Sequence, residues 1–301
     1  MPDFSRSSEL AGLVSDYEAH QKSRGLSPRT LALTSNVLQR TFLPWCLKES
    51  LSSPGQLDQK TLDRFVSNLL DRSLARESVR TYTRTVGSFV RWTQADGVVN
   101  VAVQLHQPKR QTRLLQVLTR EEIARVEESA NTERDRLIIR LLADSGIRLG
   151  ELLGLRKEDL VARGRERYIK VWGKGARERL VPLPPRLYER LSRFASRGHE
   201  RIFVTLRRSP KTGEYLPLAS RSLQNMIRYA AEAAGLQRRI HPHLFRHSYA
   251  TWALRRRMNP LQMQRILGHA DLTMISTVYS HLDASDSYSA MLDLLRSDGA
   301  V

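Results

Sequence analysis

The chain is poor in cysteine and has no long apolar run. Cys46 is the single cysteine among 301 residues, which excludes an intrachain disulfide and a thiolate metal cluster. Its neighbours over residues 42–47 are mostly apolar, so we expect a buried structural thiol. No stretch approaches the roughly 18 apolar residues of a membrane span, and no signal peptide opens the sequence. We therefore expect a soluble protein of the cytoplasm.

Two common kinds of phosphate chemistry lack their signatures here. There is no G-x-x-x-x-G-K-[ST] loop to cradle a nucleotide. There is also no obvious cluster of carboxylates to hold a pair of metal ions. The sequence therefore predicts neither a metal site nor a cofactor.

Acidic residues are few compared with basic ones. The chain has 49 Lys and Arg against 31 Asp and Glu, a formal net charge of +18. Residues 1–100 carry 13 basic and 10 acidic side chains, whereas the remaining 201 residues carry 36 and 21. This balance favours a polyanionic partner, nucleic acid first and an anionic membrane surface second. Most of the positive surplus lies after residue 100.

The length is sufficient for two domains. Residues 1–96 show apolar side chains at helical spacing, with breaks near Gly25 and before Pro28. Residues 97–116 show no sustained period, which is typical of a linker. We expect an N-terminal helical domain over 1–96, a basic linker over 97–116 and a second domain over 117–301.

Basic residues gather at the last helix expected in the first domain, over residues 77–93, and in the linker. Arginines on a helix suit contacts to DNA phosphates, but an ordinary solvated helix face explains them equally well. A basic linker suits a protein that closes around a duplex, and a plain flexible hinge has nearly the same composition. The candidate DNA-binding residues are Arg76, Arg80, Arg84, Lys109, Arg110 and Arg113.

The second domain opens with helix signals. Residues 119–122 form a capping box, and a second helix runs from about residue 133 to Gly146. Arg148 then falls at the start of a new helix, where backbone N–H groups already favour an anion. Glu151 is one turn further along, where it either holds the Arg148 guanidinium in place or forms an ordinary surface ion pair. We expect close packing to require the two glycines of this helix, Gly150 and Gly154.

A β-hairpin is expected next. Residues 168–172 and 180–183 read as strands that flank a Gly-Lys-Gly turn. Lys174 lies at or just past the tip, where a solvated turn lysine is the default interpretation.

Further amphipathic helices are expected over residues 184–195 and 223–234. Between them the sequence predicts a short strand at 201–204 and then a polar loop. The loop has three basic residues that could touch DNA: Arg207, Arg208 and Lys211.

Residues 241–281 hold the densest cluster of chemically active side chains. Pro242 suits the first turn of a helix, and His243 and Arg246 are three residues apart, on one helix face. A second helix over 260–267 ends at Gly268. His269 follows directly, and Tyr279 is ten residues later.

This combination indicates a tyrosine that attacks a phosphate. A phenol has a pKa near ~10 and needs a base to lose its proton, a role that histidine commonly fills. A guanidinium is the best bidentate donor to non-bridging phosphate oxygens. Each residue alone is more simply a helix-capping His, a surface Arg or a core Tyr, but the set at this spacing is poorly explained that way.

The motifs resemble those of the tyrosine recombinase, or phage integrase, family. They are P-H-x-x-R-H-S-x-A-T at 242–251, L-G-H at 267–269 and V-Y-S-H at 278–281, with an arginine motif around Arg148. The resemblance covers residues 117–285 strongly and 8–95 by architecture only. It implies a mainly α protein with a small antiparallel β-sheet. The expected domains are an N-terminal helical core-binding domain, SAM-like in fold, and a C-terminal α+β catalytic domain.

The resemblance also implies roles for individual residues. Tyr279 would attack a DNA phosphate to give a 3′-phosphotyrosyl bond, and Lys174 would protonate the leaving 5′-oxygen. The implied catalytic set is Arg148, Lys174, His243, Arg246, His269 and Tyr279, with supporting roles for Glu151, His247 and His281.

The implied reaction is strand exchange without ATP or metal, for integration, excision or resolution. The implied partner is double-stranded DNA with paired recombination sites, which places the enzyme at the nucleoid. A homotetramer would form on DNA through the last helix, over 285–295, with possible help from accessory proteins. Two other functions stay open from the sequence: DNA relaxation of the type IB topoisomerase kind, and a non-catalytic DNA-binding regulator.

Overall fold

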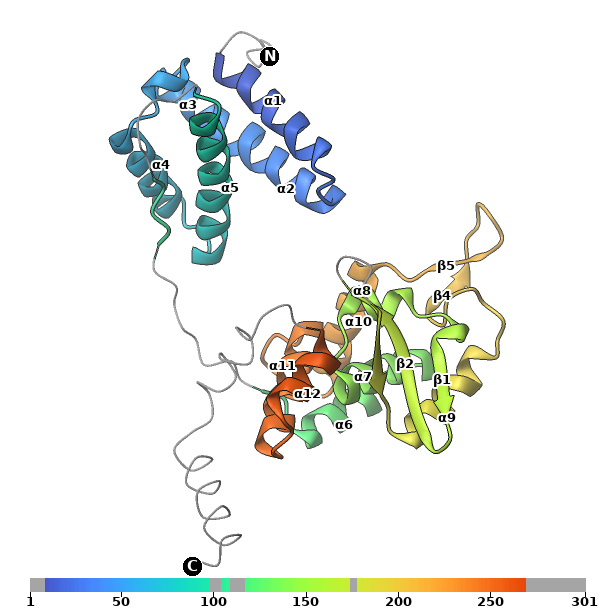
Figure 1. Ribbon diagram of the computed structural model, residues 1–301. Helices are drawn as coiled ribbons and strands as arrows, with labels where there is room; N and C mark the ends of the chain where they lie inside the picture. The colour runs from blue at the N-terminus through green and yellow to red at the C-terminus, as the bar shows by residue number, and fades with distance from the viewer. Residues whose placement is uncertain (1–8, 98–103, 109–116, 174–177, 269–301) are drawn as a thin grey trace, which may run out of the picture. The chain divides into compact units, whose positions relative to one another are not determined.

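The computed structural model describes residues 9–97, 104–108, 117–173 and 178–268 (Figure 1). The chain divides into two compact units, Met1–Arg113 and Leu114–Val301. The described strands all lie in the second unit. The fold is mainly α with small antiparallel β-sheets, which confirms the fold class expected from the sequence.

The first unit is a helical bundle. Its helix boundaries follow local signals: Ser27 caps the second helix by accepting the backbone N–H of Thr30 at 3.2 Å, and Pro28 is the first residue of that helix. The elements are α1 (Glu9–Ser23), α2 (Pro28–Val37), the π-helical turn η2 (Leu38–Phe42), α3 (Leu43–Lys48), the 3-10 turn η3 (Pro54–Gln56), α4 (Gln59–Asp71) and α5 (Arg76–Ala95).

Aromatic rings fill the core of this bundle. Phe42 meets Phe65 and Phe89 edge-on, at ring-centroid distances of 5.2 and 6.0 Å. Cys46 lies in the same core with 1% of its surface exposed. Burial raises the pKa of its thiol to about 12, so the thiol stays protonated at neutral pH. The structural role expected for this cysteine is therefore confirmed.

Part of the stretch expected to be a linker packs on the first unit. The backbone N–H and carbonyl of Gln104 exchange two hydrogen bonds with the side-chain amide of Gln59, both of 2.9 Å. Leu105 packs against the core of the bundle, and Arg80 donates to the carbonyl of Pro108. Residues 104–108 are therefore anchored to the bundle and do not behave as a plain hinge.

The second unit is built around α7, which lies among α6, α9 and α11 (Figure 1). Nine residues of α7 are buried, including all of the apolar stripe expected from the sequence. The helices are α6 (Arg120–Glu128), α7 (Glu133–Ser145), α8 (Leu149–Gly154), α9 (Pro185–Ala195), α10 (Ser220–Ala233), α11 (Pro242–Arg255) and α12 (Pro260–Leu267), with the 3-10 turn η4 (Lys157–Asp159).

Caps at the ends of these helices follow the sequence closely. The Thr119 hydroxyl accepts the Glu122 backbone N–H at 3.1 Å, and the Glu122 carboxylate accepts the Thr119 N–H at 2.9 Å. This is the capping box expected at the start of α6. Two helices end at left-handed glycines, α7 at Gly146 and α12 at Gly268.

The main sheet has three antiparallel strands in the order β1-β2-β3. β2 (Glu166–Trp172) and β3 (Glu178–Pro182) form the expected hairpin, and Ile169 pairs with Val181 on the buried face. β1 (Leu160–Arg163) was not expected, because four residues that are partly exposed carry too little alternation to identify a strand. The helix α9 packs against β2.

Two details differ from expectation. The short strand lies at β4 (Val204–Arg208) and pairs with β5 (Tyr215–Pro217), so Arg207 and Arg208 belong to a strand instead of a loop. The side chains of this hairpin are half-buried or exposed, the apolar Leu206 and Leu216 included, so no buried face marks the bounds of the strand. The second correction concerns Gly150 and Gly154: a Cβ on either would meet nothing within 4 Å, so close packing does not require them.

No helix among the described residues combines the length and the apolar character needed to cross a bilayer.

Gly146 is predicted to be indispensable to the second unit. Its φ is +61°, and a Cβ there would come within 2.8 Å of both Leu267 and Tyr249. We expect Gly146→Ala to cost roughly 2 kcal/mol or more, from backbone strain together with overpacking. Differential scanning calorimetry should show a transition lowered by about 4 °C or more.

Gly164→Ala is the matched control, because Gly164 has a φ of +54° but open space around it. We expect strain alone there, about 1 kcal/mol. Equal melting temperatures for the two variants would contradict the role given to packing at Gly146.

Candidate active site

Helix α11 presents three of the predicted site residues. His241 caps the helix, its Nδ1 accepting the backbone N–H of Leu244 at 3.3 Å, and Pro242 is the first helical residue. His243 is exposed, whereas Arg246 is only 2% exposed and His247 is buried. His243 and Arg246 therefore lie three residues apart on one helix, as the sequence predicts.

Arg246 joins three elements. Its Nη1 donates to the carbonyl of Gly146 after α7, and its Nη2 donates to the carbonyl of Leu267 at the end of α12, both at 2.6 Å. Burial, and then the nearby charge of Arg148, lowers the pKa of Arg246 to about 9. The guanidinium therefore remains charged at neutral pH, in a place where burial makes an uncompensated charge costly.

Arg148 meets Arg246 at the same carbonyl. It lies at the N-cap of α8, and its Nη1 donates to Leu267 O at 3.4 Å while its Nη2 donates to Gly268 O at 2.8 Å. Its side chain is 36% exposed. The two arginines come from positions 98 residues apart in the chain, and the end of α12 brings their guanidinium groups together.

Glu151 supports Arg148 as its spacing predicts. Its Oε1 accepts Arg148 Nη1 at 2.9 Å, and its Oε2 accepts the Arg148 backbone N–H at 2.8 Å. Burial alone would raise the pKa of this carboxyl, but hydrogen bonds from Arg179 and Arg148 outweigh it and lower the pKa. The carboxylate therefore stays ionised, although its side chain is only 5% exposed.

Arg179 is a site residue that the sequence analysis did not identify. It comes from β3, and its two terminal nitrogens donate to the two oxygens of Glu151, both at 2.8 Å. The available signal was strand alternation: Arg179 is in phase with Val181, which is fully buried on the inner face of β3. An arginine at an inward-facing strand position must have an ionic partner.

The electrostatics around His243 favour a neutral ring. Although His243 is exposed overall, the protein atoms around its ring disfavour the charged form and lower its pKa, and the positive charges of Arg246 and Arg148 lower the pKa further. The imidazole is therefore neutral at pH 7 and retains a nitrogen able to accept a proton.

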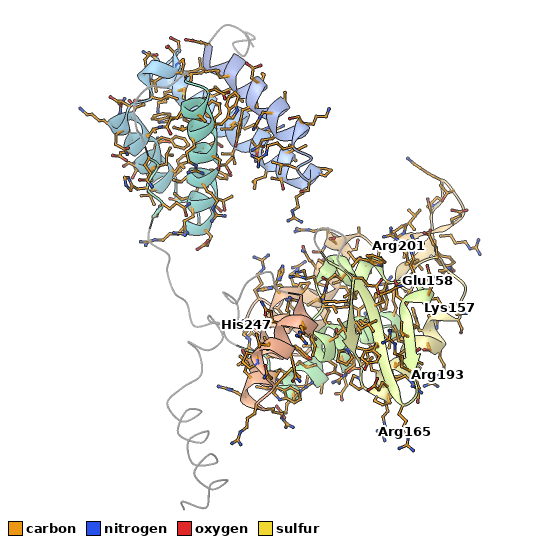
Figure 2. All side chains as sticks on the ribbon, in the orientation of Figure 1. Lys157, Glu158, Arg165, Arg193, Arg201 and His247 are labelled. Atoms are coloured by element: carbon orange, nitrogen blue, oxygen red, sulfur yellow. The ribbon has the colours of Figure 1, made fainter. Side chains whose placement is uncertain are left out.

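Among the described residues, the carboxylate that Arg148 and Arg179 contact is that of Glu151, whose charge also acts on Arg246, so these four side chains together carry a net positive charge. Such a cluster, with a neutral imidazole beside it, is suited to binding the oxygens of a phosphate. Two other arginines, Arg165 and Arg193, lie far from His247, on the side of β1 and α9 (Figure 2). Within the described ranges, no group of His, Cys, Asp or Glu has the arrangement of a metal site.

Several predicted residues fall outside the described part of the chain. Among the catalytic and supporting candidates these are Lys174, His269, Tyr279 and His281, and in the linker they are Lys109, Arg110 and Arg113. The predicted DNA-binding residues of α5 are described. Arg76 and Arg84 are exposed, whereas Arg80 is half-buried and donates to Pro108 O.

Comparison with known proteins gives matches over most of the chain. Residues 116–286 match the model of the phage integrase family. The tyrosine recombinase XerD of Chlorobaculum tepidum is 30% identical over 281 residues, which cover 87% of this chain and 88% of XerD. The tyrosine recombinase XerA of Thermococcus kodakarensis is 28% identical, covering 97% of this chain and all of XerA.

Solved structures show the same fold. The XerH site-specific recombinase in a post-cleavage complex with its difH substrate matches with a TM-score of 0.71 and 22% identity, over 90% of this chain and 81% of XerH. The Tn1549 transposon integrase, in complex with transposon right end DNA, matches with a TM-score of 0.73 and 16% identity, over 95% of this chain and 99% of that one. The chain therefore belongs to the phage integrase family and is a tyrosine recombinase, a site-specific enzyme that cuts and rejoins DNA.

Proposed function

We propose that Arg148 and Arg246 hold the non-bridging oxygens of one DNA phosphate while Tyr279 attacks its phosphorus. The observation that supports this most directly is the shared carbonyl of Leu267, which receives hydrogen bonds from both guanidinium groups. Two planar guanidinium groups held at one carbonyl are suited to binding the oxygens of a single phosphate. As charge develops on those oxygens in the transition state, the two cations stabilise it without further rearrangement.

The proposed chemical step is a transesterification. A bond forms between the Tyr279 oxygen and phosphorus, and the bond from phosphorus to the 5′-oxygen breaks. The tyrosine proton goes to a base, and the departing 5′-oxygen takes a proton from an acid. The product is a 3′-phosphotyrosyl bond, which a 5′-hydroxyl of a partner strand then attacks in the reverse sense. Each bond broken is replaced by one of the same kind, so the sequence of steps needs no ATP.

His243 is the described residue best suited to act as the base. Its lowered pKa keeps the ring neutral at pH 7, and it lies one helical turn from Arg246 on α11. In the proposal Lys174 is the acid, because an ammonium on a long flexible stem reaches a leaving group easily. His269 completes the activating set, and Glu151 and His247 support it, with His281 in a similar supporting role.

We further propose that the first unit contacts DNA through α5 and the linker. The residues proposed for phosphate contact are Arg76, Arg80, Arg84, Lys109, Arg110 and Arg113. The net charge of +18 supports a polyanionic partner. Arg80 donates to Pro108 O, so its role there includes holding the start of the basic segment against the bundle.

A tetramer on paired DNA sites is the proposed working assembly. One structurally similar protein, lambda integrase, was solved as a tetramer bound to a Holliday junction, with a TM-score of 0.70 to this chain. The apolar stripe expected over residues 285–295 is the proposed contact between subunits, and accessory proteins are possible additional partners. Paired chromosomal sites would place the enzyme at the nucleoid.

The covalent intermediate gives the test of the proposed function. Cells expressing the wild type should yield protein-linked DNA after denaturing capture, whereas Tyr279→Phe should yield none and still bind DNA, because only the nucleophilic oxygen is lost. Sequencing of the captured DNA should return a few paired inverted-repeat sites. Adducts that persist in Tyr279→Phe would show that another residue is the nucleophile.

Two other outcomes of the same capture favour the alternative functions. Wild-type adducts scattered over the genome, together with relaxation of arbitrary supercoiled plasmid without ATP, indicate topoisomerase activity. DNA binding without any adduct in the wild type indicates a non-catalytic regulator.

A change of leaving group tests the proposed role of Lys174 as the general acid. We expect Lys174→Ala to slow cleavage of ordinary DNA by about 100-fold or more, the usual contribution of a general acid. A substrate with sulfur in place of the bridging 5′-oxygen should lose much less rate, because a thiolate leaves without a proton. Single-turnover rates on both substrates measure the difference, and an equal loss on both would remove Lys174 from the acid role.

The pKa of His243 can be measured in the free protein and compared with the pH dependence of adduct formation, which tests His243 as the base. Because the protein atoms around its ring and two cations lower its pKa, the NMR titration of His243 should have a midpoint below the ordinary 6.5. The neutral form therefore persists as the pH falls through 6.5, and adduct formation should decline only below the lowered pKa. Arg148→Ala should raise the midpoint, whereas Arg148→Lys, which keeps the charge, should leave it closer to the wild-type value. A midpoint above 6.5 in the wild type would contradict this assignment.

A further inference from the structure

Arg179 touches three elements of the active site at once. Its Nη1 and Nη2 donate to Glu151 on α8, both at 2.8 Å, and its Nε donates to Ile266 O on α12 at 2.7 Å. The residue itself lies on β3, and its side chain is 12% exposed. A Cβ on Gly268 would come within 2.9 Å of the guanidinium, so the arginine lies directly against the backbone at the end of α12.

We propose that Arg179 is a positioning residue for catalysis, which acts through Glu151 on Arg148. This inference rests on the proposed function, in which Arg148 holds the phosphate. Arg179 does not need to touch DNA. It sets where the Glu151 carboxylate lies, and that carboxylate in turn sets the direction of the Arg148 guanidinium.

The sharing of one carboxylate is the first argument. Oε1 of Glu151 accepts from both Arg148 Nη1 and Arg179 Nη1, and Oε2 accepts from the Arg148 backbone and Arg179 Nη2. If Arg179 were absent, the buried carboxylate would have one cation left and would pair with it more fully. Arg148 would then be neutralised and turned away from the phosphate. Arg179 therefore leaves part of the positive charge of Arg148 available to the substrate.

The backbone at the end of α12 is the second argument. Arg179 binds Ile266 O, while the next two carbonyls, of Leu267 and Gly268, are acceptors for Arg148 and Arg246. Arg179 thus fixes the segment 266–268, which also holds Arg148 and Arg246, the two residues proposed to bind the phosphate. A displacement of about 1 Å in such a segment is enough to cost roughly 100-fold in rate.

Only arginine has the geometry for this role. The three donors of Arg179 lie in one plane, two directed to a carboxylate and the third to a carbonyl on another element. Lysine would keep the charge, but it is a single point donor and cannot span both partners. The structure therefore predicts that a positive charge at position 179 is not sufficient for positioning Glu151 and the end of α12, and that the planar guanidinium is needed.

The first test compares variants on one defined substrate. The substrate is a nicked duplex built from a site recovered by the covalent capture, and the measurement is the single-turnover rate of adduct formation with full-length enzyme. We expect Arg179→Met to slow this rate by roughly 100-fold, and Arg179→Lys by at least about 10-fold. The control Arg167→Met should keep the wild-type rate, since the described hydrogen bonds of the Arg167 side chain go to the carbonyls of Gly164 and Glu166 at the β1–β2 turn. A rate near wild type for Arg179→Lys would overturn the positioning role, because charge alone would then suffice.

The second test asks through which group Arg179 acts. Replacing a non-bridging oxygen by methyl gives an uncharged methylphosphonate, which needs less help from Arg148. The defect of Arg179→Met should shrink by at least about 10-fold on this substrate, as the defect of Arg148→Ala should. It should not shrink on the substrate with a 5′-sulfur leaving group. Rescue by sulfur and not by methylphosphonate would overturn the inference, because Arg179 would then act on the leaving group through the β2–β3 hairpin.

A double-mutant cycle separates positioning from general stability. If Arg179 acts through Glu151, the variant Arg179→Met with Glu151→Gln should be no slower than the slower single variant, within about 3-fold. The opposite result is that the rate losses of the two single variants multiply in the double variant. If Arg179→Met is also slowed equally on all three substrates and melts at a lower temperature, its role is purely structural and the inference is overturned. If the wild type itself forms no adduct, the proposed function fails; if the wild type and Arg179→Met react equally fast, only this inference fails.

Discussion

Holding positive charge inside a protein is the constraint on which this active site depends. Arg246 is almost fully buried and Arg179 nearly so, and the described contacts provide a single carboxylate, Glu151, for the whole cluster. All three arginines also donate to backbone carbonyls, and those carbonyls lie at the C-terminal ends of α7 and α12. A helix C-terminus has unpaired carbonyls and the negative end of the helix dipole, so it is a favourable place for a cation. The cluster can therefore remain positive, as an anion-binding site must.

The two glycines that end these helices serve packing and electrostatics together. Gly146 and Gly268 both adopt positive φ, which turns the chain and leaves their carbonyls free for Arg246 and Arg148. Neither position has room for a Cβ, since Tyr249 and Leu267 lie against Gly146 and Arg179 lies against Gly268. Each glycine therefore ends its helix and also accepts a hydrogen bond from an arginine. The point where the helix ends thus determines where the arginine lies.

Much of this arrangement could be predicted from local sequence. The capping box at Thr119, the helix start at Pro242, the hairpin, and the pairing of Arg148 with Glu151 all depend on residues within a few positions of one another, where spacing determines geometry. Arg179 was missed because its partners are 28 and 87 residues away, and no local rule gives such distances. The strand β4 was expected too early, at 201–204, because its side chains are half-buried or exposed and no buried alternation marks its bounds. The packing of Leu105 on the bundle was missed because one anchoring leucine leaves no period in the sequence.

The long span of the site's hydrogen bonds affects when the enzyme becomes able to cut. Arg179 reaches Ile266 across 87 residues, Arg246 reaches Gly146 across 100 and Arg148 reaches Gly268 across 120. Contacts so distant in sequence form late in folding, and the bonds of Arg179 to Ile266 O and of Arg148 to Gly268 O cannot form before α12 has been synthesised. Until α12 is in place, Arg148 and Arg246 lack the carbonyl of Leu267, to which both donate in the folded chain. With these arginines as the proposed phosphate ligands, strand cleavage requires a completed second unit.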